Sequence, residues 1–387
     1  MERPRIKRTK ELVATAAGDV YVLCPSDDED LRIEQPDGVA RGLLAALDGT
    51  RTVAELERDF GRERVADALA ALTAAELLDD GADDELLSPR ERARHDLQLR
   101  YFSDVAASGA PSEYQRRLRE ARVLMLGVGG LGSWASYALA CCGIGELVLV
   151  DHDRVEESNF NRQILYRERD VGRVKVDVAA EALREFDSSC RLVPVERMLE
   201  DVADVRELAE RADVVVNSAD WPAHDIERWV NRACFEAGVP FITMSHSPPV
   251  GRVGPLYVPG VTGCFACQEA TYRTEFPLYD EIVEQRRARP TPAATLGPVC
   301  AFVGGQVALE VLHQLTGLVR PATLGRAHIY DLRTMTVTRR GGAAAARLPR
   351  VRWTGVAGHA TSPARRIASC VWPSARLGPE STGRGRV

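Results

Sequence analysis

A glycine-rich turn between an apolar strand and a helix restricts the possible folds of this chain more than any other segment. The apolar run 123–126 leads directly into Gly127-Val128-Gly129-Gly130-Leu131-Gly132, and a helical pattern follows over 133–142. Glycines let backbone N–H groups approach phosphate oxygens at the positive end of a helix dipole. The turn therefore predicts a nucleotide site built on Gly127, Gly129, Gly130 and Gly132.

A second strand-like run ends at Asp151, 19 residues after Gly132. A carboxylate at this spacing can accept hydrogen bonds from ribose hydroxyls, and taken alone the pattern suggests NAD. The glycine turn and this carboxylate predict a nucleotide, but they do not choose which one.

The pattern of apolar residues over 121–340 predicts the fold class. Strand-like runs at 123–126, 146–150, 213–216 and 240–244 alternate with helical patterns. Such alternation is typical of parallel strands joined by crossover helices. We therefore expect an α/β domain with a Rossmann-like parallel sheet and flanking helices.

Residues 1–90 predict a separate small domain. Two strand-like stretches, 19–24 and 31–34, surround a turn-rich segment and indicate a hairpin. Helical patterns follow at 39–47 and 63–78, and Thr52 with Glu55 forms a capping box for a helix between them. A hairpin with three helices predicts a winged-helix-like α+β domain, and the charged segment 91–120 is expected to be a helical linker.

Charge and composition exclude several classes of function. Residues 11–90 carry 20 Asp and Glu against seven Arg and no Lys, a net charge of −13, which would repel nucleic acid. No apolar run reaches the roughly 18 residues of a membrane helix, and no apolar signal core follows the basic start. We therefore expect a cytoplasmic protein with neither a nucleic-acid nor a membrane partner.

The last segment, 341–387, differs from the rest of the chain. It is rich in Ala, Gly, Pro and Arg, with eight Arg and a single acidic residue, Glu380. This composition predicts a disordered tail.

A longer motif that begins at Asp151 indicates which nucleotide is bound. Residues 151–163 read D-x-D-x-V-x-x-S-N-x-x-R-Q, and Gly172-Arg173-Val174-Lys175 follows. Over about 121–335 the sequence resembles the ThiF/MoeB/HesA family, whose members share their adenylation fold with the ubiquitin-activating enzymes. The resemblance implies ATP and Mg²⁺ as cofactors and adenylation of a carboxylate or amide.

The resemblance also implies roles for residues of this motif. It implies that Asp151 binds the ribose, that Asn159 and Arg162 contact the phosphates, and that Lys175 grips the triphosphate. Asp153, in the same motif, is expected among the nucleotide-binding residues.

Two further residues take implied roles from the family. Asp220, in Asn217-Ser218-Ala219-Asp220, would help to hold magnesium near the reacting phosphate. Arg100, in Leu99-Arg100-Tyr101-Phe102, resembles the arginine that the family extends across its dimer to the partner's ATP. A homodimer is therefore expected.

The chemistry of adenylation fits these residue types independently. A carboxylate that attacks the α-phosphate of ATP meets a crowded anion, so the site must supply positive charge, here from Arg162 and Lys175. Magnesium prefers oxygen ligands, and Asp220 follows an apolar strand, where ligands of open sheets bind.

Cysteines raise the questions of a metal and of a nucleophile. Nine irregularly spaced cysteines in a long chain predict reduced thiols without disulfides. Cys264-Phe265-Ala266-Cys267 is half of a structural zinc site. The family usually supplies a second C-x-x-C pair, but only Cys370 lies near the C-terminus, so zinc and two reduced loop thiols both stay open.

The expected position of a catalytic cysteine contains none. Residues 271–298, which follow the metal pair, lack cysteine, and Cys300 is expected to pack in a helix as a small apolar residue. We therefore predict adenylation without a covalent thioester. His246 and Arg252 are candidates for steering the acceptor.

The front domain suggests the substrate. Residues 11–85 resemble, by pattern only, the PqqD-like recognition elements of ribosomal-peptide maturation enzymes, in which a leader peptide adds as a strand to the sheet edge. Its acidic surface would favour a basic leader or simply maintain solubility. The expected partner is a precursor peptide with a leader, together with a partner maturation enzyme.

Three functions stay open at this stage. The first is adenylation of a precursor peptide in a bacteriocin-like pathway, the second is activation of a ubiquitin-like sulfur carrier, and the third is an inactive leader-binding scaffold. The intact set of Gly127 to Gly132, Arg162, Lys175 and Asp220 argues against the scaffold. The acidic front domain argues against a simple carrier activator.

Overall fold

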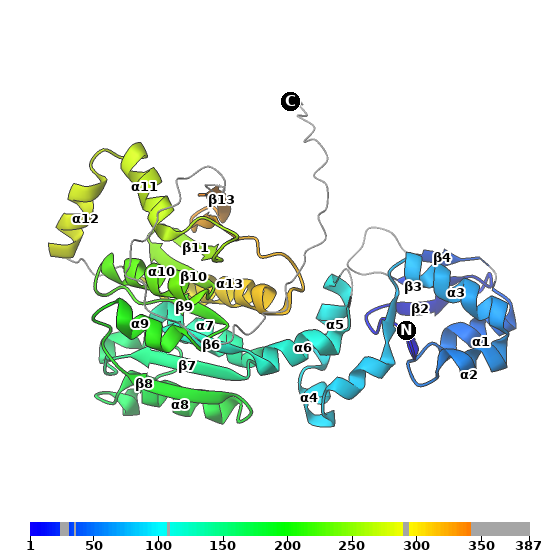
Figure 1. Ribbon diagram of the computed structural model, residues 1–387. Helices are drawn as coiled ribbons and strands as arrows, with labels where there is room; N and C mark the ends of the chain where they lie inside the picture. The colour runs from blue at the N-terminus through cyan, green and yellow to red at the C-terminus, as the bar shows by residue number, and fades with distance from the viewer. Residues whose placement is uncertain (24–30, 35, 107–108, 289–293, 342–387) are drawn as a thin grey trace, which may run out of the picture. The chain divides into compact units, whose positions relative to one another are not determined.

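The computed structural model describes residues 1–23, 31–34, 36–106, 109–288 and 294–341 (Figure 1). The predicted tail, including Cys370, lies outside the described residues from 342 onward, as does the turn of the predicted hairpin at 24–30.

The front of the chain contains a three-stranded antiparallel sheet. Its strands are β2 (Glu11–Ala14), β3 (Val20–Leu23) and β4 (Leu31–Ile33), in the order β2-β3-β4. The pairing of β3 with β4 confirms the predicted hairpin. Strand β2 was not predicted, because none of its side chains is buried and so no alternating apolar pattern marks it.

Three helices cover this small sheet: α1 (Gly38–Ala46), α2 (Val53–Phe60) and α3 (Arg62–Ala74). The predicted capping box is confirmed, since the Thr52 side chain accepts from the Glu55 N–H and the Glu55 side chain accepts from the Thr52 N–H. The prediction of a helix to residue 78 is wrong. After α3 the chain turns through Glu76 (φ +57°) into β5 (Leu78–Asp80), which pairs with β1 (Pro4–Ile6).

The segment between the two sheets is helical, as predicted. It comprises η1 (Gly81–Leu86), α4 (Pro89–Arg94), α5 (Asp96–Val105) and α6 (Pro111–Glu120). Polar contacts attach the front domain to α5, where Ser103 Oγ donates to Asp79 Oδ2 at 2.8 Å and Thr9 Oγ1 donates to Asp104 Oδ1 at 2.6 Å. Burial raises the pKa of Asp79.

The main sheet has eight strands, and five of them are parallel; the sequence predicted four of these five and missed the strand Arg191–Glu196. The parallel strands are β6 (Arg122–Leu126), β7 (Glu146–Asp151), β8 (Arg191–Glu196), β9 (Val214–Asn217) and β10 (Phe241–Ser247), in the order β10-β9-β6-β7-β8. The Rossmann-like α/β fold is therefore confirmed. Beyond β10 the sheet continues with three antiparallel strands that were not predicted: β11 (Val250–Tyr257), β12 (Ala327–Asp331) and β13 (Thr336–Arg340).

Helices cover both faces of this sheet (Figure 1). Helices α7 (Gly130–Cys141), α8 (Lys175–Phe186) and α13 (Gly297–Thr316) bury one core against Val123, Met125, Leu147 and Leu149. Helices α9 (Val202–Ala209) and α10 (Asp225–Ala237) bury the other core against the alternate side chains of the same strands. Strands buried on both faces explain the continuous apolar runs of the sequence.

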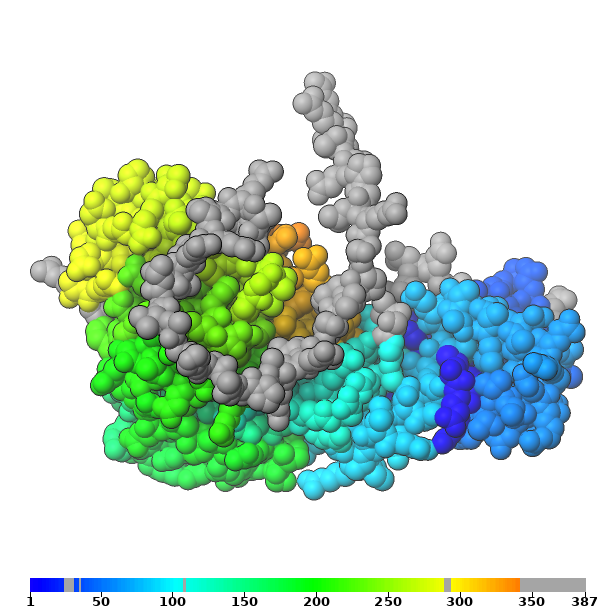
Figure 2. Space-filling model, in the orientation of Figure 1, coloured from blue at the N-terminus to red at the C-terminus, as the bar shows by residue number. Residues whose placement is uncertain are grey.

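The remaining helices lie around the sheet ends. Short 3-10 turns η2 (Glu157–Asn159) and η3 (Glu168–Asp170) precede α8, and α11 (Phe265–Glu275) and α12 (Tyr279–Ala288) follow β11. Figure 2 shows the surface of α11 and α12 as a yellow protrusion beside the green surface of the sheet domain.

Helix α13 corrects one expectation from the sequence. By length and apolar composition it could span a membrane, although no such run was expected. Its side chains instead pack on α7, β10 and β11, and Val303, Val307 and Val311 are fully buried. This packing is that of a core helix.

Two neighbouring glycines of α13 offer a test of its packing on α7. A Cβ on Gly304 would lie 2.9 Å from Trp134 Cβ and 3.0 Å from Ala135 N, whereas a Cβ on Gly305 meets nothing within 4 Å. We expect Gly305→Ala to stabilise the protein by about 0.5–1 kcal/mol through helix propensity, and Gly304→Ala to destabilise it by about 1–3 kcal/mol through overpacking. Thermal unfolding followed by circular dichroism would measure both, and equal melting temperatures for the two variants would contradict the close α7–α13 contact.

Candidate active site

A cavity of about 740 Å³ opens at the carboxyl ends of β6, β7, β9 and β10. This volume lies within the range of roughly 300–1,000 Å³ that is typical of ligand sites. Strand β6 lies between β7 and β9. Helix α7, which follows β6, packs on one face of the sheet, and α10, which follows β9, packs on the opposite face. Ligands of open α/β sheets bind at such a switch point.

The glycine turn forms the floor of this cavity. Gly127 has φ +85°, and a Cβ on Gly132 would lie 2.0 Å from the Gly127 carbonyl oxygen. A Cβ on Gly130 would lie 2.9 Å from Cys300 Sγ and 3.3 Å from Arg162 Cδ. The turn therefore requires glycine at positions 127 and 132, while Gly130 lies close to the side chains of Cys300 and Arg162. Gly127, Gly129 and Gly130 line the cavity, whereas Gly132 lies behind them at the start of α7.

Asp151 connects the turn to the end of β7. Its Oδ2 accepts from the Val128 N–H at 2.8 Å, and its Oδ1 accepts from the Asp153 N–H at 2.9 Å. The carboxylate is thereby fixed in orientation at the cavity wall, and each oxygen keeps a further lone pair that could accept from a ribose hydroxyl.

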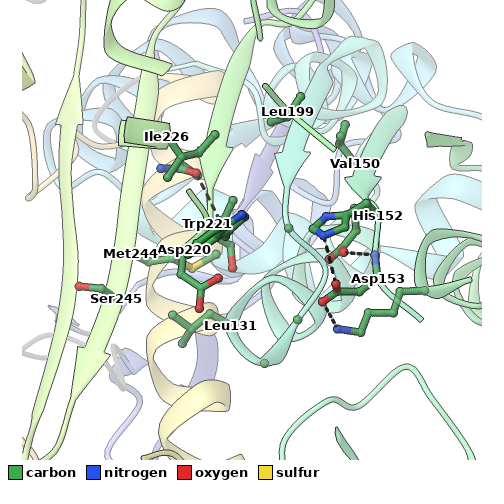
Figure 3. A pocket seen from close by; sticks show the side chains of 18 of the residues that line it. Leu131, Val150, His152, Asp153, Leu199, Asp220, Trp221, Ile226, Met244 and Ser245 are labelled. Carbon is green, nitrogen blue, oxygen red and sulfur yellow. Dashed lines mark hydrogen bonds and ion pairs between the residues drawn. The ribbon is translucent and has the colours of Figure 1, made fainter. Parts of the chain in front are cut away.

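Lys175 and Asp153 form an ion pair at the cavity wall, with 2.8 Å between Lys175 Nζ and Asp153 Oδ2 (Figure 3). Lys175 is only 6% exposed, and it begins α8. His152, which the sequence did not single out, lies 3.4 Å from the other Asp153 oxygen through its Nε2. Ligand atoms of Asp151, His152 and Asp153 lie close enough together that they could hold a cation.

Arg162 lines the same cavity and is held by its own loop. Its Nη1 donates to the Ser158 carbonyl at 2.6 Å and to Asn161 Oδ1 at 2.9 Å, while its carbonyl accepts from Trp134 Nε1 at 3.0 Å. Its Nε and Nη2 make no hydrogen bond with any described residue. These donors are available to an anionic ligand.

Two predicted nucleotide ligands are placed differently from each other. Asp220 follows β9 and lines the cavity, and Figure 3 shows its carboxylate opposite His152 and Asp153. Asn159 is 4% exposed and does not line the cavity. Its Oδ1 accepts from the Glu156 N–H at 3.0 Å, so Asn159 shapes the loop that carries Arg162.

The two candidates for steering the acceptor also differ in position. His246 lines the cavity, and its Nε2 is buried without a hydrogen-bond partner among the described residues. Burial lowers the pKa of His246, the positive charge of Arg162 lowers it further, and Asp220 opposes this shift. Arg252 does not line the cavity, and its Nη2 donates to Gln268 Oε1 at 3.4 Å.

Arg100 lies outside this cavity on α5. Its Nη2 pairs with Asp96 at 2.8 Å within the same helix. The structure thus does not bring Arg100 to the nucleotide site of its own chain.

The cysteines of the predicted zinc pair lie at the start of α11. Their Sγ atoms are 3.6 Å apart. Two thiolates of a tetrahedral zinc site with bonds of about 2.3 Å would be about 3.8 Å apart, so Cys264 and Cys267 fit two of four ligand positions. Cys300 is fully buried in α13, as predicted, and burial raises the pKa of its thiol.

Several cavity residues were not found from the sequence. They lie beside predicted residues, after β8, at the start of α10 or before α13: Gln163, Arg197, Met198, Leu199, Trp221, His224, Ile226, Glu227, Met244, Ser245 and Thr295. Trp221 and Ser245 directly follow recognised strand-end residues and could have been inferred from that position. Met198 and Glu227 carry no signal of this kind.

Comparisons with known proteins agree with the predicted resemblance. The sequence model of the ThiF family matches residues 96–348. The sulfur carrier protein ThiS adenylyltransferase of Escherichia coli is 32% identical over 245 residues, which cover 63% of this chain and 89% of that protein.

Solved structures match a longer part of the chain. The crystal structure of PaaA is 28% identical with a TM-score of 0.67 and covers 87% of this chain and 99% of its own. E. coli MccB with ATP is 24% identical with a TM-score of 0.68, covering 87% of this chain and 96% of its own. MccB in complex with N-formylated MccA is 23% identical with a TM-score of 0.68 and the same coverage.

The surroundings of His246 predict its titration. Because burial and Arg162 disfavour the imidazolium, we expect His246 to titrate below its ordinary value of 6.5 and to be neutral at pH 7. Arg162→Ala should raise this pKa by removing a nearby cation, and Asp220→Asn should lower it by removing an anion. Histidine NMR titration, assigned with His246→Gln, would measure the shifts, and His313, which faces Glu310, should not respond. Absence of both shifts would place His246 away from the two residues.

Proposed function

This chain belongs to the ThiF family, and we propose that it adenylates a carboxylate or amide of a ribosomally made precursor peptide and releases pyrophosphate. The observation that carries the proposal is one cavity in which the glycine turn, Arg162, Lys175 and Asp220 converge. The small sheet, whose outer strands are β2 and β4, precedes these residues in the chain.

The residues of the cavity suit this reaction. An oxygen of the substrate attacks the α-phosphorus of ATP, a new O–P bond forms, and the bond to the β,γ-pyrophosphate breaks. Arg162 and Lys175 would stabilise the negative charge that develops on the phosphates. Asp220, which faces them across the cavity, would hold the Mg²⁺ that accompanies ATP. Asp151 would orient the ribose through its remaining lone pairs.

The front domain favours a peptide over a free sulfur carrier. The match to ThiS adenylyltransferase covers 63% of this chain, whereas the folds of PaaA and MccB cover 87%. MccB is crystallised with N-formylated MccA, and by analogy this chain would take a peptide. Strands β2 and β4 are the edges of the small sheet, where a leader could add as a further strand.

Two other functions are alternatives to adenylation of a precursor peptide. The name of the E. coli relative favours activation of a ubiquitin-like sulfur carrier. An inactive leader-binding scaffold would need no phosphate-binding cations, and the free Arg162 donors argue against it.

Further properties belong to this proposal. We infer a cytoplasmic homodimer in which Arg100 reaches the partner's ATP, a zinc ion on Cys264 and Cys267, with Cys370 as a possible further ligand, and a partner maturation enzyme. The pair of thiols at 3.6 Å supports the zinc ion.

Pyrophosphate exchange tests the adenylation step. With labelled pyrophosphate, ATP and the cognate precursor peptide, we expect exchange that falls at least about 100-fold in Arg162→Ala and in Asp220→Ala, because each removes charge that acts on the reacting phosphates. Arg191→Ala and Asp177→Ala remove exposed charges outside the cavity and should retain activity.

The same assay separates the alternatives. Exchange with a sulfur carrier protein but not with the peptide would favour the second function. Absence of exchange with both would favour the scaffold. Retained exchange in either cavity variant would remove that residue from the mechanism.

A second test concerns leader binding to the front domain. Leu31 on β4 and Leu12 on β2 are exposed apolar residues on the two sheet edges. If the leader packs on an edge, Leu→Asp there should weaken binding roughly tenfold, since burial of a leucine contributes about 1.5 kcal/mol. Fluorescence anisotropy with labelled precursor peptide would measure this. Leu97→Asp, on exposed α5 surface, is the control, and unchanged affinity in both edge variants would reject strand addition at the front domain.

A further inference from the structure

The two walls of the cavity differ in charge. The wall from β6, β7 and the start of α8 carries Arg162 and Lys175. A third lining cation, Arg197 after β8, is paired with Asp204 and Glu207. The opposite wall, from the end of β9, α10 and the end of β10, contains no Lys or Arg among its described lining residues. Its titratable and aromatic side chains are those of Asp220, Trp221, His224, Glu227 and His246. Figure 3 shows Asp220, Trp221, Ile226, Met244 and Ser245 on this side, away from His152 and Asp153.

Glu227 is an acidic group of this wall that makes no hydrogen bond or ion pair with any described residue, and the same is true of Asp220. Glu227 lies on α10 and lines the cavity. Arg228 pairs with Glu269 at 2.7 Å, and Arg252 donates through Nη2 to the neutral amide of Gln268 at 3.4 Å, so neither arginine forms an ion pair with Glu227. Burial raises the pKa of Glu227, Arg252 and Arg228 oppose this shift, and Glu269 adds to it. A carboxylate in this setting gains most from a cation supplied by a ligand.

The histidines around Glu227 would not repel a cationic ligand. His224 and His246 are both held toward the neutral form, because burial and nearby arginines lower their pKa values. Trp221 is 46% exposed, although it lies on the cavity wall. An indole ring attracts ammonium and guanidinium groups to its face. Ile226 and Met244 supply apolar surface on which the stem of a long side chain could lie.

We propose that this wall selects a substrate peptide with a lysine or arginine near the group that is adenylated, and that its cationic head binds Glu227 while its stem lies along Trp221, Ile226 and Met244. The inference rests on the proposed function, because it assigns a substrate class to the same site. Asp220 remains free for Mg²⁺, and the cations of the other wall remain free for the phosphates. The two chemical requirements of the cavity are thereby separated in space.

Differential selection from a displayed peptide library tests this assignment with a random pool in place of a chosen substrate. Random dodecapeptides displayed on their mRNA are selected on the full-length protein, saturated with Mg²⁺ and α,β-methylene-ATP. Wild type is compared with Glu227→Gln, which keeps the shape of the side chain, and with Glu227→Lys. Glu236→Gln is the matched control, because Glu236 lies on the same helix and pairs with Arg232 outside the cavity.

We expect enrichment of Lys and Arg in the wild-type and Glu236→Gln pools. Individual enriched peptides should bind roughly tenfold more weakly to Glu227→Gln, as a charge-assisted hydrogen bond is lost. Glu227→Lys should instead enrich Asp and Glu. Peptides that bind the front domain should be enriched equally in every pool, so they do not contribute to the differences between pools.

Other outcomes would overturn the inference. Equal enrichment of Lys and Arg by wild type and by Glu227→Gln would mean that Glu227 acts as a neutral hydrogen-bonding group or not at all. Absence of basic residues from the wild-type pool would reject the substrate class. A melting temperature of Glu227→Gln equal to that of wild type excludes misfolding as the cause of a loss. Failure of the proposed function would appear separately, as absent pyrophosphate exchange with peptides that bind.

Discussion

The close approach of two backbone segments, Gly132 against the Gly127 carbonyl, is the constraint on which the site depends. A Cβ on Gly132 would lie 2.0 Å from that oxygen, and a Cβ on Gly127 would lie 3.0 Å from Ala219 N after β9. The turn therefore joins the ends of three neighbouring strands, since Asp151 binds it from β7 as well. Because α7 begins within the turn, its first N–H groups are held at the cavity floor before any ligand arrives.

The cations of the cavity are positioned by the same framework. A lone ammonium buried as deeply as Lys175 would cost several kcal/mol, and its ion pair with Asp153 offsets part of this cost. Arg162 is held through its carbonyl and through one guanidinium nitrogen, which leaves the others free. Charge that is fixed in advance does not have to reorganise as the phosphates react, and this is the main source of electrostatic catalysis.

The sequence was informative where structure is local and less so where it depends on packing. The glycine turn, Asp151 and Asp220 could be placed because each lies at the end of an apolar strand, and parallel strands bring their carboxyl ends to one edge. Strands β2 and β13 were missed because all or nearly all of their side chains are exposed, so no alternation marks them. Which face of α10 meets the cavity depends on how that helix packs, and Glu227 therefore carried no signal.

The topology also separates the two sides of the cavity along the chain. The side that carries Arg162 and Lys175 comes from β6 to α8, whereas the opposite wall comes from β9 to β10, and the two meet at the switch point of the sheet. Side chains on the cavity face of α10 can change without moving the glycine turn, because the core beneath that helix is a different one from the core beneath α7 and α8. A fold of this kind can keep one adenylation chemistry while its acceptor varies.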